Sequence, residues 1–152
     1  MIDVRQEAPD APAARALFAE YMDLVAERAG QDLEGAEHIF ATTDVFAGPG
    51  AAWLVIYDDD RPVACGGLRP LSPDVGEIKR MFVTARARRR GYGSRLLAEL
   101  EGIARDAGQA RIRLLSTELL PEALELYRKN GYTIVSTHTE DDHRDYWLEK
   151  PL

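Results

Sequence analysis

The stretch Glu77–Leu97, which reads EIKRMFVTARARRRGYGSRLL, decides how the rest of this sequence is arranged. Its first third alternates and is rich in residues that favour strands, which predicts a β-strand. These residues are Ile78, Met81, Phe82 and Val83. From Tyr92 onward, apolar residues recur at helical spacing, at Leu96, Leu97, Leu100, Ile103 and Ala104. We therefore predict a strand that leads into a helix through a short connecting segment.

The connecting segment combines arginines with glycines: Arg86, Arg88, Arg89 and Arg90 precede Gly91 and Gly93. Glycine lets a backbone approach a ligand that a Cβ atom would hold away, and the unpaired N–H groups at a helix start attract anions. The segment therefore predicts a phosphate cradle, whereas an ordinary basic turn would not account for so many arginines. The spacing fits neither a P-loop, which needs a lysine after the glycines, nor a dinucleotide-binding turn, which needs a third glycine.

The run Arg88-Arg89-Arg90-Gly91-Tyr92-Gly93 resembles the acyl-CoA signature of the GNAT superfamily of N-acetyltransferases, Arg/Gln-x-x-Gly-x-Gly/Ala. The preceding Lys79–Val83 resembles the fourth strand of that family, and Pro121–Tyr132 resembles its final helix and strand. The resemblance covers nearly the whole chain. One departure is that many members place Asn just before the final helix to hold the pantetheine arm, whereas Leu119 and Leu120 stand there in this sequence.

Length and composition predict one domain, residues 1–152, because 152 residues with 45% hydrophobic content support one core and leave no room for a second. The charge is uneven: residues 1–76 hold 5 Lys/Arg against 14 Asp/Glu, and residues 77–152 hold 14 against 12. An acidic chain with one local basic strip argues against a nucleic-acid partner, which requires a broad basic face. The strip suits a single anionic ligand.

We expect a soluble, cytoplasmic protein with no membrane partner. No run of residues approaches the roughly 18 apolar residues of a membrane span, and the first residues lack the basic-then-apolar plan of a signal peptide. The single cysteine, Cys65, permits no internal disulfide, which is compatible with a reducing compartment.

Periodicity and turn residues predict the remaining elements. Strands are expected at 2–6, 52–57, 62–68, 111–115, 132–137 and 144–149, and helices at 12–30, 33–40, 92–107 and 121–131. Residues 42–50 are expected to form a loop, and Gly66-Gly67 to mark a bulge or close packing rather than a ligand contact. Strands before, between and after helices indicate a mixed α/β fold. The resemblance implies the GNAT arrangement, a mostly antiparallel central sheet flanked by helices.

The resemblance further implies the activity. It implies an acetyl-CoA-dependent N-acetyltransferase that transfers an acetyl group to a primary amine of a small molecule or peptide, by direct attack in a ternary complex. The alternative is a non-catalytic acyl-CoA-binding regulatory module, which would not consume acetyl-CoA when amines are supplied. A homodimer would be in keeping with the family. The acidic first half would suit a cationic acceptor, although surplus carboxylates also serve solubility.

The cofactor site implied by the resemblance uses the backbone. The amides of Met81, Phe82 and Val83 would receive the pantetheine arm like an added strand. The pyrophosphate would be wrapped by the residues of the cradle, Arg88, Arg89, Arg90, Gly91, Tyr92, Gly93 and Ser94. A β-branched replacement of Gly93 would then weaken acetyl-CoA binding without unfolding the protein.

Two residues are candidates for acid–base chemistry. Glu77, at the head of the central strand, matches the position where the family often places a general base; the alternative is a strand-end carboxylate paired with a neighbouring arginine. Tyr127 matches the tyrosine that the family uses near the thioester sulfur, where a phenol of ordinary pKa about 10 would donate a proton to the departing thiolate. The alternative is a core aromatic residue.

Other reactive residues point to no second chemistry. Cys65 lacks a local Cys-His-Asn signature and is expected to be a buried small hydrophobe rather than a nucleophile. His38, His138 and His143 are scattered without metal-ligand spacing, so we expect no metal. The acidic loop Glu140–His143 either recruits a cation or is simply solvated.

Overall fold

The computed structural model describes residues 1–30, 44–140 and 143–152. In this part of the chain seven strands form one sheet in the order β1-β2-β3-β4-β5-β7-β6. The strands are β1 Ile2–Gln6, β2 Ala52–Asp58, β3 Arg61–Pro70, β4 Val75–Val83, β5 Arg111–Thr117, β6 Thr133–Glu140 and β7 His143–Pro151. Only β4 and β5 pair in parallel; the other neighbours are antiparallel. The predicted mixed, mostly antiparallel α/β sheet is confirmed.

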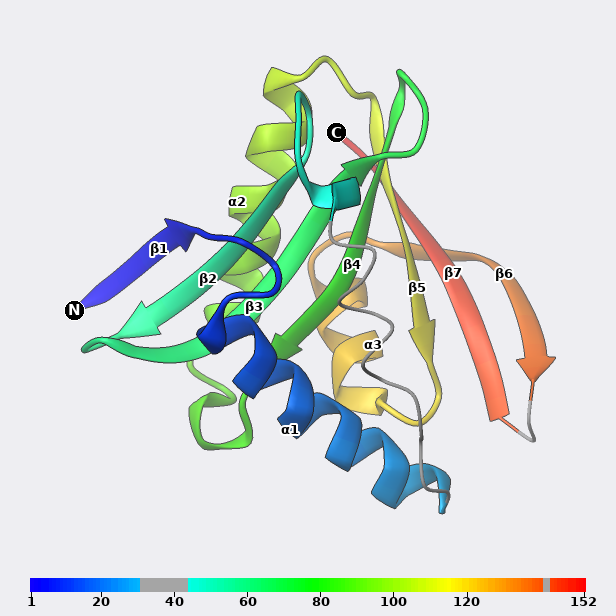
Figure 1. The fold of residues 1–152 in the computed structure, drawn as a ribbon. Coiled ribbons are helices and arrows are strands. Elements are labelled where there is room, and N and C mark those ends of the chain that lie inside the picture. The colour runs from blue at the N-terminus through cyan, green and yellow to red at the C-terminus, as the bar shows by residue number, and fades with distance from the viewer. Residues whose placement is uncertain (31–43, 141–142) are drawn as a thin grey trace.

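In the described part of the chain, three α-helices cover the sheet: α1 Pro12–Ala29, α2 Tyr92–Asp106 and α3 Pro121–Lys129. Figure 1 shows α1 on one face of the sheet and α2 with α3 on the other. Helix α1 ends at Gly30 in the left-handed conformation, and α3 has its proline in the first turn, as expected. Within the expected 42–50 loop, Asp44–Phe46 form a 3₁₀ helix. The helix expected at 33–40 lies outside the described residues.

Each face of the sheet carries its own apolar core. On the face of α2, Leu96, Leu97 and Leu100 pack with inward residues of the strands such as Ile56 and Leu114. On the face of α1, Ala14 and Leu17 belong to a second cluster with Phe46, Trp53, Val55, Tyr57, Cys65 and Phe82. Successive side chains of β2 point to opposite faces of the sheet, so this strand contributes to both clusters. Because both of its faces are buried, its sequence is a continuous apolar run and does not alternate between apolar and polar residues.

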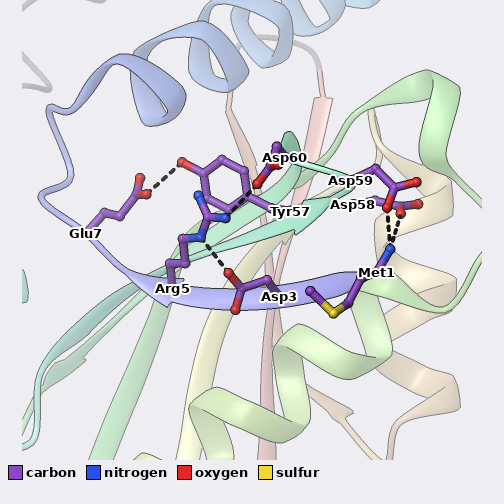
Figure 2. Close-up of polar contacts among 8 residues, drawn as sticks. All are labelled: Met1, Asp3, Arg5, Glu7, Tyr57, Asp58, Asp59 and Asp60. Carbon is purple, nitrogen blue, oxygen red and sulfur yellow. Dashed lines mark hydrogen bonds and ion pairs between the residues drawn. The ribbon is translucent and has the colours of Figure 1, made fainter.

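The β2–β3 hairpin turns through Asp59 and Asp60, which have φ of 49° and 65°. Two positive φ angles suit a tight hairpin, and Asp tolerates this conformation better than most residues. Beside the turn, the Arg5 guanidinium donates to Asp3 at 2.6 Å and to Asp60 at 3.0 Å, and the Tyr57 hydroxyl donates to Glu7 at 2.6 Å (Figure 2). These bonds tie the edge strand β1 to the hairpin.

Strand β4 contains a bulge. Cys65 pairs with Phe82 and Gly67 with Lys79, so two residues of β4, Arg80 and Met81, stand opposite the single Gly66 of β3. Arg80 has a φ of 56°, which an arginine rarely adopts. A bulge bends its strand, and pairing of β4 with β5 ends at Ile78. The expected bulge is confirmed, with the one extra residue on β4.

Gly67 is also a packing position, and replacing it by Ala should destabilise the fold. A Cβ there would lie 2.6 Å from Cδ1 of Phe46 and 2.8 Å from Cε3 of Trp53, so two buried rings would have to shift. We expect Gly67→Ala to lower the free energy of unfolding by about 1–3 kcal/mol in urea denaturation. Gly102→Ala is the control, because a Cβ there meets nothing within 4 Å; it should be neutral or stabilise by about 0.5–1 kcal/mol. An unchanged Gly67→Ala midpoint would contradict this packing.

Candidate active site

A cavity of about 320 Å³ opens where β4 and β5 separate. The described wall comes from five elements and the turn before α3. These are β4 (Ile78, Lys79, Arg80, Met81) and β5 (Leu115, Ser116, Thr117), α1 (Tyr21, Val25, Ala29), the turn before α3 (Leu119, Leu120) with α3 itself (Ala123, Tyr127), and Asp145 of β7. Tyr127 belongs to the core on the α2 face, whereas Tyr21 packs against the core on the α1 face. The cavity therefore reaches both sides of the sheet.

The cradle residues form the connection that was expected between strand and helix. After β4, a 3₁₀ helix at Ala85–Ala87 leads to Gly91, which has a φ of 83° and caps α2 without a side-chain hydrogen bond. Arg89 also has a positive φ, of 64°, and the side chains of Arg89 and Arg90 are exposed. The start of α2 thus presents backbone N–H groups beside two arginines, an arrangement that can bind an anion.

The cradle side chains that follow Gly91 fasten the helix start instead of facing a ligand. The buried Tyr92 hydroxyl donates to the Asp58 carboxylate in a short hydrogen bond, which is the main cause that raises the pKa of this tyrosine. The Ser94 hydroxyl accepts a hydrogen bond of 3.1 Å from the Asn130 amide. These contacts hold α2 to β2 and to the end of α3.

The structure corrects one expectation about Gly93. A Cβ at this position would lie 2.6 Å from Cδ2 of Leu126, a residue of α3. Gly93 therefore allows α2 and α3 to pack closely, and a β-branched replacement would disturb this packing. Such a variant would not separate cofactor affinity from stability, and other residues are needed to test the cradle.

Tyr127 lies on the cavity wall and is also part of the core, with 7% of its surface exposed. Its ring meets that of Tyr132 edge-on, with 6.0 Å between centroids. Burial raises the pKa of Tyr127 above its ordinary value, because the charged phenolate would lose its hydration. The hydroxyl therefore stays protonated at neutral pH and is available as a donor.

Glu77 is buried, at 5% exposed, and accepts a hydrogen bond of 2.7 Å from Nε of Arg69. It lies in the paired part of β4, opposite Arg113 of β5, one residue before the strands separate. It is not among the described residues that line the cavity. The arginine partner matches the structural alternative, and the role of Glu77 as a base stays a prediction that would require a relay through water.

The remaining candidates fall outside the cavity or outside the described residues. Cys65 is buried, and burial raises the pKa of its thiol to about 12, so the nucleophilic thiolate does not form at neutral pH. His38 and the side chains of the acidic loop Glu140–His143 lie outside the described residues. Over residues 1–30, 44–140 and 143–152, no group of three or more His, Cys, Asp or Glu side chains could hold a metal ion.

Two parts of the site gave no signal in the sequence. The Glu20 carboxylate of α1 accepts hydrogen bonds from the Thr84 hydroxyl at 2.7 and 2.8 Å and from the Ala85 amide at 3.2 Å, which holds α1 against the segment that leads to the cradle. Asp145 of β7 lies on the cavity wall. Both contacts join residues far apart in sequence, so no local pattern could have revealed them.

Comparison with known proteins identifies the class of this protein. The model of the acetyltransferase (GNAT) family matches residues 13–132, so the chain belongs to the GNAT family of acetyltransferases and is an acyltransferase enzyme. It is 36% identical over 109 residues to the IAA acetyltransferase of Azospirillum brasilense, covering 70% of this chain and 71% of the relative. It is 30% identical over 107 residues to the uncharacterised N-acetyltransferase YjgM of Escherichia coli, covering 68% of this chain but only 59% of that relative.

Solved structures share the fold. A Klebsiella pneumoniae protein described as an acyl-CoA N-acyltransferase has a TM-score of 0.76 and 26% identity, with 100% of this chain and 98% of that chain covered. A GNAT family acetyltransferase from Elizabethkingia anophelis, solved with acetyl-CoA bound, has a TM-score of 0.72 and 16% identity, with 99% and 98% covered. The predicted GNAT fold is therefore confirmed. Among the described helices, none is long and apolar enough to span a bilayer.

Proposed function

We propose that this enzyme transfers an acetyl group from acetyl-CoA to a primary amine by direct attack within a ternary complex. The observation that carries the proposal is the cavity between β4 and β5. Residues from both faces of the sheet line this cavity, and one of them, Tyr127, carries a protonated phenol. Two substrates could meet there from opposite faces. The acetyl-CoA bound to the Elizabethkingia structure supports the choice of acyl donor.

Acetyl-CoA would lie along the open edge of β4. Pairing with β5 covers only Val75–Ile78, so the β5-facing edge of Met81, Phe82 and Val83 is left outside that ladder and can receive the pantetheine amides like an added strand. The pyrophosphate would then rest on the cradle at the start of α2. Leu119 and Leu120 stand where many family members place Asn, so the proposal includes no side-chain hydrogen bond to the pantetheine arm there.

The reaction would need two proton transfers. The nitrogen of the neutral amine attacks the thioester carbonyl, a C–N bond forms and the C–S bond breaks. The departing thiolate takes the hydroxyl proton of Tyr127, and the amine nitrogen loses a proton to Glu77 through water or to solvent. Tyr127 then regains its proton from solvent. The buried Cys65 offers no accessible thiolate for an acetyl-enzyme intermediate.

A thiol-release assay tests the proposal as a whole. Purified protein with acetyl-CoA should release CoA when amines, amino acids or peptides are supplied, and initial rates with both substrates varied should give intersecting lines. Parallel lines would contradict direct transfer. Bound acetyl-CoA with no thiol release for any amine would favour the non-catalytic module.

We also propose that residues 1–152 fold as one domain and act in the cytoplasm.

Tyr127→Phe should lower kcat by about 10²–10⁴-fold, because it keeps the ring and removes only the proton donor. Acetyl-CoA affinity and the melting temperature should stay nearly unchanged. Because burial raises the pKa of Tyr127, the wild-type enzyme should keep its donor at pH values where an ordinary tyrosine would already ionise. Steady-state kinetics from about pH 6 to about pH 11, above the ordinary tyrosine pKa of about 10, would test both points. A variant that melts early yet turns over normally would show a purely structural tyrosine.

The cradle is tested by replacing its exposed arginines, which avoids the packing of Gly93. Arg89→Ala with Arg90→Ala should raise the Kd of CoA by about tenfold at low salt, because two charge-assisted contacts to phosphate are lost, and by less at high salt. Isothermal titration calorimetry measures this. Arg61→Ala, an exposed arginine at the start of β3, is the control and should leave the Kd unchanged. An unaltered Kd in the double variant would contradict the cradle.

Glu77→Gln should lower kcat and alter the acidic limb of the pH–rate profile if Glu77 receives the amine proton through water. Arg69→Gln is the matched control, because it breaks the same hydrogen bond but leaves the carboxylate in place. A structural pair predicts that both variants lose stability and keep the wild-type profile. A base predicts that only Glu77→Gln loses the acidic limb.

A further inference from the structure

Asp145 is the one carboxylate among the described residues that line the cavity. It lies in β7, where the register sets it opposite Thr117 of β5 and His138 of β6. Its side chain is only 13% exposed, and one carboxylate oxygen lies 3.5 Å from Nε2 of the more exposed His138. The function proposed above gives this carboxylate no part.

The wall near Asp145 is mostly apolar. Leu115 of β5 and Val25 and Ala29 of α1 line the same cavity, together with the ring of Tyr21. Burial raises the pKa of Tyr21, and the negative charge of Asp145 raises it further. A carboxylate in such surroundings interacts strongly with charges, because little water screens it.

Two basic residues of β4, Lys79 and Arg80, also contribute to the wall. The Arg80 guanidinium lies over the ring of Phe46, with 5.2 Å to the centroid, and Phe46 is not part of the cavity wall. The side chain of Lys79 is exposed. Among the described residues of the wall, Asp145 therefore supplies the one carboxylate that could accept a charge-assisted hydrogen bond from a cationic group.

We propose that Asp145 binds the ammonium group of the acceptor, so that this enzyme selects primary amines with an apolar body. This inference rests on the proposed acetylation of amines and assigns the acceptor class for the same cavity. The ammonium would form a charge-assisted hydrogen bond with the Asp145 carboxylate, and an alkyl or aryl body would contact Tyr21, Val25 and Leu115. The bound ammonium would then lose one proton to solvent, and the neutral nitrogen would attack the thioester as described above. Acceptors whose only charge is a carboxylate would be repelled.

Three probes with one body and different charges test the inference: 2-phenylethylamine, 2-phenylethanol and 3-phenylpropionate. Calorimetric titration uses the full chain saturated with CoA, so no turnover is needed. The wild-type protein should bind the amine at least about tenfold more tightly than the alcohol, and the propionate most weakly. Equal affinity for amine and alcohol, tighter binding of the propionate, or no binding of the amine would overturn the inference whether or not any variant folds.

Asp145→Asn should weaken binding of the amine by about tenfold and leave the alcohol unchanged. Asp23→Asn is the matched control: it removes one negative charge from an exposed residue of α1 that lies outside the cavity, and should change none of the three affinities. If the amine binds through Asp145 but no acetylation follows, the proposed function fails and the inference stands. If amines are acetylated with the same selectivity by Asp145→Asn, the inference fails alone.

Discussion

The site depends on the bulge in β4. Two residues, Arg80 and Met81, occupy the length that Gly66 occupies in β3, so the strand bends and leaves its ladder with β5 after Ile78. An unbroken parallel ladder would fill this space with backbone hydrogen bonds and leave no cavity. The positive φ of Arg80 is the local cost of the bend, and the cores on both faces of the sheet hold the strand in that shape.

The cradle is held in place by polar contacts from three other elements. Asp58 of β2 accepts from Tyr92, Asn130 beyond α3 donates to Ser94, and Glu20 of α1 accepts from Thr84. Hydrogen bonds to charged groups are stronger than those between neutral groups, which suits the first and third contacts. Side chains thus supply rigidity, and the backbone N–H groups at the start of α2 are left for the proposed anion.

Environment distinguishes the two residues proposed for acid–base chemistry. Tyr127 is a buried residue on the cavity wall, and its burial favours the neutral, protonated phenol. Glu77 is equally buried but accepts a hydrogen bond from Arg69. Asp145, two strands away from β4, brings a third ionisable group to the same cavity. The sheet thereby gathers groups with different surroundings around one space.

Periodicity and turn residues were enough to predict the described strands and helices, because these features depend on neighbours within a few residues. The cradle was predicted from a local glycine–arginine motif and Tyr127 from the family resemblance, and their roles stay predictions. Tertiary structure decided which strand carries the extra residue of the bulge and which residue pairs with Glu77. It also decided that Gly93 packs against Leu126 and that Asp145 lies on the cavity wall. Each of these depends on contacts between elements far apart in the chain. A short polar residue such as Asp145 looks the same in a sequence whether its carboxylate faces water or an apolar cavity; only the packing around it makes the difference.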